Sequence, residues 1–302
     1  MLTYSDFQPV TFENKHILDR YLSKYPQKHS EYSVVTMLSW EHYAQCFFAE
    51  YKNHLIIDCV TDGSHALFAP VGPNVLSVLD EVYAFSKTEG AALCIYDEEL
   101  CQQFSARHPE AAVTEVRGYF EYCWKTETLA ELKGKRFVGI RGQIHQFQRN
   151  FTYTVEKISS DNLEEVRTMI HQWGAEKEFE KSSEIPDELR AADISLNHFS
   201  ELNLEGILIR INGEVAAVSI WENRCSDIVF IHYEKGLKKY PGIFKVINWE
   251  TAQTLCGRYA VINREGDMDR CGLRESKMRY HPEFFIKAYV VEAGSAALEN
   301  NK

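Results

Sequence analysis

The chain has 302 residues, of which 45% are hydrophobic and 25% charged, a composition typical of globular proteins. This length suits two domains rather than one. The formal net charge of -11 predicts a surface that repels nucleic acids and anionic lipids, so a site for either needs a local basic patch. No apolar run approaches the roughly 18 residues of a membrane span, and the first residues lack a signal-peptide pattern. We therefore expect a cytoplasmic protein without an integral membrane segment.

The eight cysteines show no metal-binding spacing. No pair follows a CxxC pattern, and most cysteines lie inside apolar runs. We expect reduced, buried thiols and no metal site.

The first half is predicted to begin with a helix and to continue as a sheet with two further helices. The turn residues Lys52–Asn53 and Asp62–Ser64 separate its first strands. Apolar spacing predicts helices and strands in this order: helix 11–25, strands 46–51, 54–60 and 66–70, helix 75–87, strand 91–96, helix 98–106, strands 112–116 and 118–124.

The second half repeats this order. Asn212–Gly213 predicts a tight hairpin between two of its strands. The predicted elements are helix 129–150, strand 153–158, helices 161–180 and 188–202, strands 206–211, 214–221 and 227–233, helix 242–256, strand 258–263, helix 268–279 and strand 284–291.

The order of elements in each half resembles that of a GNAT (acyl-CoA N-acyltransferase-like) domain. Helices come first, an antiparallel meander follows, and helix, strand, helix and strand complete the half. We expect an α+β fold of two tandem GNAT-like domains, residues 1–125 and 126–302, with mostly antiparallel sheets flanked by helices.

Four segments carry a more specific resemblance: residues 119–123, 129–137, 232–235 and the long run 262–282. They resemble the C-terminal domain family of phosphatidylglycerol lysyltransferase. Proteins of this kind are tandem GNAT folds similar to Fem-type aminoacyl transferases, which implies aminoacyl-tRNA as donor and its 3′ end as partner. The resemblance implies substrate contacts for Tyr122, Arg141, Lys235, Asn248, Asn263, Arg264 and Asp267. The alternatives are that Tyr122 belongs to the core and that Asn248 and Asn263 satisfy backbone groups inside the domain.

The strand predicted at 227–233 carries candidate catalytic residues at its end. Alternation places His232 and Glu234 on one face, where either could accept a proton from an attacking amine. A backbone N–H near Lys235 would stabilise the oxyanion. The alternative is that Glu234 pairs with a lysine and only fixes the loop.

Gly242 opens the following helix, where a GNAT domain cradles the pyrophosphate of acyl-CoA. Only this one glycine of the usual phosphate loop is present, which predicts weak CoA binding. A plain helix start explains a single glycine equally well.

A basic stripe is predicted on helix 268–279. Arg270, Arg274 and Lys277 follow helical spacing, and Arg264 precedes them. They could contact the phosphates of a tRNA 3′ end. The alternative is a solvated face balanced by nearby acids, with Asp267 as helix cap.

These patterns leave three functions open. The first is acyl or aminoacyl transfer from aminoacyl-tRNA to an amine or hydroxyl acceptor. The second is N-acyl transfer with acyl-CoA as co-substrate. The third is a catalytically inactive GNAT-like module that binds a ligand or partner. No cofactor beyond the co-substrate is implied.

Overall fold

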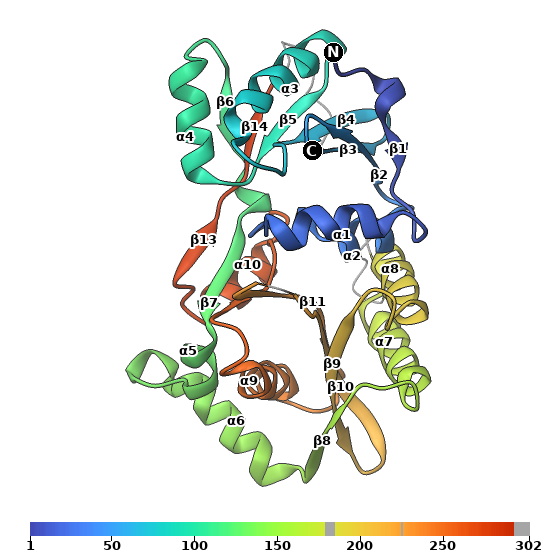
Figure 1. Cartoon of the computed structure of the whole chain (residues 1–302). Coiled ribbons are helices and arrows are strands. Elements are labelled where there is room, and N and C mark those ends of the chain that lie inside the picture. Colours follow the sequence, from blue (N-terminus) through green and yellow to red (C-terminus); the bar gives the residue numbers. More distant parts are fainter. Residues whose placement is uncertain (179–184, 225, 293–302) are drawn as a thin grey trace. The chain divides into compact units, whose positions relative to one another are not determined.

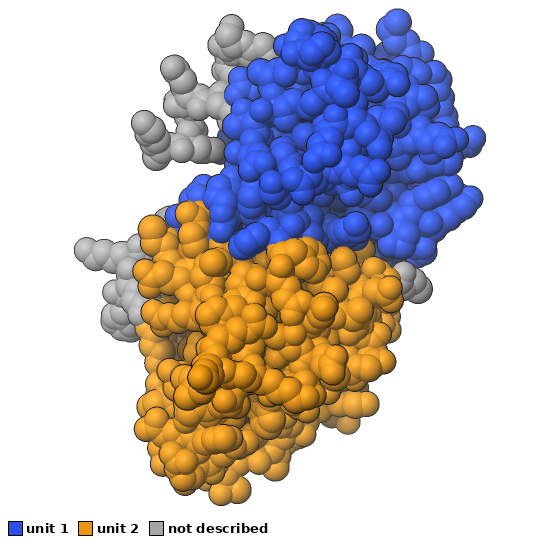
Figure 2. All heavy atoms as spheres, turned by 90° about the vertical axis from the view of Figure 1, so that its left-hand side faces the viewer, with its two compact units in different colours: residues 1–121, 266–270, 285–302 blue, residues 122–265, 271–284 orange. Residues whose placement is uncertain are grey.

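A computed structural model describes residues 1–178, 185–224 and 226–292. The chain forms two compact units, which Figure 2 colours separately. Unit 1 comprises residues 1–121, 266–270 and the segment from residue 285, and unit 2 comprises residues 122–265 and 271–284. The first division falls near the expected boundary at residue 126. The expected second domain is nevertheless not one continuous segment, because residues 266–270 and the last strand join unit 1.

Unit 1 contains one seven-stranded sheet with helices packed on it. In chain order its elements are η1 (Tyr4–Asp6), β1 (Gln8–Pro9), α1 (Lys15–Lys24), η2 (Ser30–Tyr32), α2 (Val34–Ser39), β2 (Gln45–Tyr51), β3 (His54–Thr61), β4 (Ser64–Phe68), α3 (Val75–Glu89), β5 (Ala92–Ile95), α4 (Glu98–Arg107), β6 (Val113–Glu115), η3 (Arg117–Tyr119) and β14 (Tyr289–Val291).

Unit 2 is built around the second sheet. Its elements are α5 (Thr126–Glu131), η4 (Lys135–Phe137), α6 (Val138–Asn150), β8 (Tyr153–Lys157), α7 (Leu163–Glu178), α8 (Ile185–Asn197), β9 (Leu204–Ile211), β10 (Glu214–Glu222), β11 (Ile228–Gly236), α9 (Ile243–Leu255), β12 (Val261–Asn263) and α10 (Cys271–Met278). Strands β7 (Glu121–Lys125) and β13 (Phe284–Ile286) complete its sheet.

The two sheets share one topology. The first has the order β1-β2-β3-β4-β5-β14-β6, and the second β8-β9-β10-β11-β12-β7-β13. Each begins with an antiparallel meander and then has one parallel pair, β4 with β5 and β11 with β12. The expected fold of two GNAT-like repeats, with mostly antiparallel sheets flanked by helices, is confirmed.

One strand is exchanged between the repeats. After β6 the chain passes into the other sheet as β7, and after β13 it returns to the first sheet as β14. Figure 1 shows β14, in red, between β5 and β6. The single strand expected at 284–291 is therefore two strands in different sheets. An apolar run predicts an extended backbone, but it does not specify the partner strand.

The predicted hairpins form, and their turn residues adopt the left-handed backbone conformation that such turns require. Asn212 and Gly213 both have positive φ, as a two-residue hairpin turn requires. Lys52 and Asn53 adopt the same left-handed conformation between β2 and β3. The helix expected at 129–150 is interrupted, because Leu132 has a φ of 47° and ends α5. The last part of the helix expected at 161–180 lies outside the described residues.

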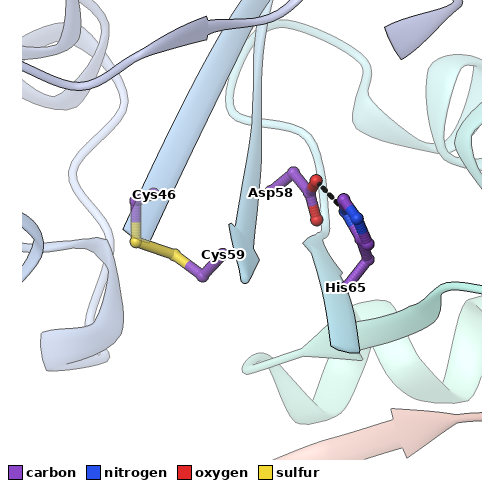
Figure 3. Close-up of a disulfide and its surroundings, with 4 residues drawn as sticks. All are labelled: Cys46, Asp58, Cys59 and His65. Atoms are coloured by element: carbon purple, nitrogen blue, oxygen red, sulfur yellow. Dashed lines mark hydrogen bonds and ion pairs between the residues drawn. A yellow bond between two sulfur atoms is a disulfide. The ribbon is translucent and has the colours of Figure 1, made fainter. Parts of the chain in front are cut away.

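The expectation that all thiols are reduced and buried is wrong for several cysteines. Cys46 on β2 and Cys59 on β3 are directly opposite each other and form a disulfide, shown in Figure 3. Beside it, buried Asp58 accepts a hydrogen bond of 2.6 Å from Nδ1 of His65. Of the free thiols in the described residues, three are buried and two are exposed, Cys256 and Cys271. Cys225 lies outside that part of the chain.

Among the described residues, no helix is long and apolar enough to cross a membrane.

Candidate functional site

The two parallel strands of unit 2 end at different points. β11 and β12 pair from Ile228 and Val261 up to Phe230 and Asn263. β12 then stops, whereas β11 continues to Gly236. The continuation of β11 pairs with β10 on one side only. In open α/β sheets, ligands bind outside the carboxyl ends of parallel strands, and β11 and β12 are such a pair.

Glu234 lies on this continuation of β11 and is almost fully buried, with 9% of its side chain exposed. Its Oε1 accepts a hydrogen bond of 2.8 Å from Nη2 of Arg264, the residue directly after β12. Its Oε2 accepts a bond of 3.3 Å from Nδ2 of Asn248 on α9. One carboxylate therefore orients two polar side chains from different elements.

The other ends of these two side chains are unsatisfied. Nη1 of Arg264 and Oδ1 of Asn248 are shielded from solvent, and neither has a hydrogen-bond partner in the described part of the chain. Leaving such an atom unpaired costs about 1–3 kcal/mol. The site thus holds one unpaired donor and one unpaired acceptor, both attached to groups that Glu234 fixes.

A half-buried lysine completes this cluster. Lys245 is in the first turn of α9, and its Nζ lies 4.8 Å from the ring centre of Tyr280. Burial and the nearby charge of Arg264 together lower its pKa to about 8, against the opposing effect of Glu234. The Arg264 guanidinium lies 5.2 Å from the centre of the same ring. We call Glu234, Lys245, Asn248, Arg264 and Tyr280 the Glu234 cluster.

His232 does not share this cluster. A register shift between β10 and β11 at Ile220 and Trp221 disrupts the alternation that would place His232 with Glu234. His232 instead lies between Glu265, at 2.9 Å, and Glu222, at 3.3 Å. Burial alone would lower its pKa, but these two carboxylates outweigh burial and raise the pKa to about 9. An imidazolium held charged between two carboxylates is a poor proton acceptor, so this geometry favours a structural cation at His232. A catalytic role for His232 remains a prediction.

Two other predicted contacts point elsewhere. Lys235, next to Glu234 on β11, pairs with Glu188 of α8 and lies over the ring of Trp173 in α7. Neighbouring strand residues face opposite sides of a sheet, and Figure 1 shows α7 and α8 on one side of β11 and α9 on the other. Asn263 is fully buried and accepts the Glu265 N–H at 2.8 Å, so it shapes the turn after β12.

Lys277 and Tyr122 form a buried support beneath that turn. Nζ of Lys277 donates to the carbonyl oxygens of Arg264, at 2.7 Å, and Glu265, at 3.0 Å. Its ammonium also lies 5.5 Å from the ring centre of Tyr122, which is fully buried. Lys277 is only 8% exposed, so it is not the phosphate contact expected from sequence. It fixes the backbone that carries Arg264.

The expected basic stripe does not form. α10 begins at Cys271, so Arg270 precedes the helix and helical spacing does not align it with Arg274. Asp267 is fully buried. Its Oδ2 accepts a hydrogen bond of 3.2 Å from Nη1 of Arg117, and its Oδ1 accepts one of 2.9 Å from the N–H of Asp269. Asp267 therefore orders its own loop. A phosphate contact by Arg274 remains a prediction.

Gly242 and Arg141 have backbone roles. Gly242 precedes α9 with a φ of 95°, a conformation that favours glycine. Whether it contacts phosphate remains a prediction. Nη1 of Arg141 donates to the carbonyl oxygens of Leu132 and Gly134, which ties the side chain to the end of α5. A substrate contact by Arg141 remains a prediction.

Sequence reasoning missed Lys245 and Tyr280. One signal for Lys245 was present in the sequence. It is a lysine in the first turn of an otherwise apolar helix start, where the helix dipole disfavours a cation and no acidic residue offsets it. Tyr280 had no such signal, because its role depends on tertiary contacts with Lys245 and Arg264.

Solved structures similar to this chain show the same fold. A conserved protein of unknown function from Bacteroides thetaiotaomicron VPI-5482 is 25% identical, with a TM-score of 0.87, over 95% of this chain and 98% of its own. The C-terminal domain assigned to a lysylphosphatidylglycerol synthetase of Agrobacterium fabrum is 15% identical, with a TM-score of 0.68, over 94% and 93%. L-PGS from Bacillus licheniformis is 15% identical, with a TM-score of 0.63, over 93% and 92%.

No curated protein matches the sequence significantly. The family model described as phosphatidylglycerol lysyltransferase, C-terminal, matches residues 22–292. This range covers most of unit 1, all of unit 2 and every member of the Glu234 cluster. The chain belongs to the phosphatidylglycerol lysyltransferase C-terminal family.

Proposed function

We propose that this chain transfers an aminoacyl group from aminoacyl-tRNA to an amine or hydroxyl acceptor, and that the Glu234 cluster is the site of transfer. Family membership supports a transferase of the aminoacyl or acyl type. The observation that carries the proposal is the buried, unpaired donor and acceptor held by one carboxylate.

An aminoacyl ester offers a match for both unpaired atoms. Its carbonyl oxygen accepts from Nη1 of Arg264, and its α-amino group donates to Oδ1 of Asn248. The thioester of acetyl-CoA offers the carbonyl but has no amino group for Asn248. The proposal therefore favours an aminoacyl donor over acyl-CoA. Because both atoms are shielded in this state, a substrate reaches them only when neighbouring side chains move.

The reaction needs no covalent enzyme intermediate. The acceptor nitrogen or oxygen attacks the ester carbonyl carbon, and a C–N or C–O bond forms. Lys245, in its neutral form, takes the acceptor's proton, and Nη1 of Arg264 donates to the oxyanion that develops. The bond from the carbonyl carbon to the ribose oxygen then breaks, and the proton on Lys245 passes to that oxygen as it leaves. Glu234 keeps Arg264 and Asn248 in place throughout.

The same donor fixes where the protein would act. Aminoacyl-tRNA is a cytoplasmic metabolite, so the proposal places the protein in the cytoplasm with the tRNA 3′ end as its partner. The acceptor class remains open between amines and hydroxyl compounds.

A binding experiment tests the proposal. The probes are stable 3′-(aminoacyl)amido-adenosines, one per amino acid, together with the matching analogues that lack the α-amino group, and acetyl-CoA. We expect at least one aminoacyl probe to bind about tenfold more tightly than its desamino analogue. Asn248→Leu should remove that preference, because it removes the acceptor atom for the amine. Asn150→Ala, an exposed asparagine at the end of α6, is the control and should keep it.

Two results would overturn the proposal. One is tighter binding of acetyl-CoA than of every aminoacyl probe, which would favour acyl-CoA-dependent transfer. The other is a preference for the amino group that survives in Asn248→Leu, which would place the aminoacyl group at another site.

A further inference from the structure

Unit 1 contains a cavity at the position that corresponds to the proposed transfer site of unit 2. It lies at the carboxyl ends of the parallel strands β4 and β5 and has a volume of about 250 Å³. The residues that directly follow these strands, Ala69 and Pro70 after β4 and Tyr96 and Asp97 after β5, line it. The cavity lies within unit 1 and has no member of the Glu234 cluster in its wall.

Much of the wall is aromatic. The rings of Tyr32 and Tyr96 meet edge to face at 5.7 Å, and His29 stacks on Tyr96 at 4.0 Å. The polar ends of two of these side chains are engaged by protein: the Tyr32 hydroxyl donates to Ala69 O at 2.9 Å, and Nε2 of His29 lies 3.0 Å from Tyr119 O. Their remaining contribution to the cavity is ring surface. Pro26, Val75 and Leu100 add apolar surface.

One lining carboxylate has an oxygen to spare. Oδ1 of Asp97 accepts the Leu100 N–H at 2.8 Å and caps α4. Oδ2 has no hydrogen bond or ion pair with any residue that the structure describes. A carboxylate oxygen beside aromatic rings is a partner for an N–H donor, and aromatic faces attract a cation as well.

The charges around the cavity also favour a cation. Glu98 and Glu99 follow Asp97 in the first turn of α4 and oppose the positive end of its dipole, about half a charge. Glu98 is itself paired with Lys287 at 3.0 Å, whereas no ion pair of Glu99 is seen among the described residues. The buried carboxylate of Glu121 lies 3.5 Å from Nδ1 of His29. Lys28 is the single lysine or arginine among the lining residues, and it already has an interaction with the protein. Carboxylates therefore outnumber cations here.

We propose that this cavity binds a small primary amine in its ammonium form, with the ammonium on Asp97 and an apolar body against Tyr32, Tyr96 and Leu100. The site is separate from the Glu234 cluster and does not depend on the proposed transfer reaction. The positive charge of the ammonium group, which Asp97 recognises, distinguishes this ligand from an anionic or neutral molecule of the same size.

Three probes of nearly equal shape separate these ligand classes: phenethylamine, 2-phenylethanol and 3-phenylpropionate. Titrations of the full chain are followed by NMR at neutral pH. We expect phenethylamine to bind saturably, 2-phenylethanol to bind at least tenfold more weakly, and 3-phenylpropionate not to bind. Equal binding of phenethylamine and 2-phenylethanol, or tighter binding of 3-phenylpropionate, would overturn the proposal without any variant.

The variant Asp97→Asn gives an independent test. The Asn side chain still accepts the Leu100 N–H, so the cap of α4 is retained while the charge is lost. Phenethylamine affinity should fall at least tenfold, to the level of 2-phenylethanol. Glu99→Gln removes the same charge from an exposed position outside the lining and should change affinity less than twofold. Unchanged binding in a folded Asp97→Asn protein would contradict the assignment.

Discussion

Arg264 donates to Glu234 with one terminal nitrogen at 2.8 Å and leaves the other, Nη1, buried without a partner among the described residues. An ion pair formed only for stability would be expected to use both nitrogens, since a bidentate geometry is the stronger one. Because only Nη2 pairs with Glu234, the carboxylate can hold the guanidinium so that Nη1 is available to a bound ligand. The proposal takes the ligand group at Nη1 to be the carbonyl oxygen of an aminoacyl ester.

Arg264→Lys should therefore lower the rate of transfer by about 10²- to 10³-fold, the usual loss for one oxyanion donor. The lysine can still pair with Glu234, so the melting temperature should change little. Arg258→Lys, which alters a half-exposed pair with Glu205, is the matched control and should leave the rate unchanged. Single-turnover kinetics and thermal melts on both variants make the comparison. A large loss of stability at an unchanged rate would mean that Arg264 is only structural.

Lys245 should give the reaction a characteristic pH dependence. Its pKa is lowered to about 8, and the proposed proton acceptor is the neutral amine. The single-turnover rate should rise about tenfold per pH unit below this value and level off above it. Lys245→Arg remains charged across this range, so it should lose most of the activity and the inflection near pH 8. Lys239→Arg, an exposed lysine paired with Glu214, should behave as wild type. A wild-type profile retained in Lys245→Arg would exclude Lys245 as the acceptor.

His232 should stabilise the fold in a pH-dependent way. Its pKa is raised from 6.5 to about 9 in the folded chain, so its stabilisation is fully present below about pH 6.5 and is lost as the pH rises through 9. The shift corresponds to a free energy on the order of 3 kcal/mol. Urea unfolding of wild type and His232→Gln should show a stability difference that shrinks between these pH values. Asn150→Ala, at an exposed position without a titrating side chain, should show no such trend. A pH-independent difference would contradict a charged His232.

The disulfide should contribute measurably to stability. A bond that closes a loop between residues 13 positions apart is expected to contribute roughly 3 kcal/mol by constraining the unfolded chain. A reductant should lower the melting temperature of wild type but not that of the Cys46→Ser, Cys59→Ser double variant. Cys256→Ser, at an exposed free thiol, should respond as wild type does. Identical melting curves with and without reductant for wild type would show that the bond is absent in solution.

Local sequence signals predicted much of the fold. Asn212–Gly213 specified a hairpin, and two-residue turns such as Lys52–Asn53 also fix register, so position 46 falls opposite position 59. The pairing of Cys46 with Cys59 was therefore accessible in principle, but composition had suggested reduced thiols. The exchange of β7 and β14 was not predictable, because nothing local distinguishes the two sheets as partners.

The site was predicted only in part. Glu234, Asn248 and Arg264 were among the expected residues, and the structure brings them together. His232 was misplaced because a register shift depends on the partner strand and has no signature in its own strand. Lys277 was expected at the surface because helical spacing shows which residues share a face but not whether that face is buried.

The most direct test of the central claim is a transfer assay with bulk tRNA charged with a mixture of labelled amino acids. The tRNA is incubated with the protein and a protein-free cell extract that supplies both water-soluble and lipid acceptors. The account predicts that wild type moves label from tRNA to an acceptor. Arg264→Lys should transfer label at least a hundredfold more slowly, and Arg258→Lys should transfer it at the wild-type rate. Label that leaves tRNA no faster than by spontaneous hydrolysis, or equal transfer by wild type and Arg264→Lys, would contradict it.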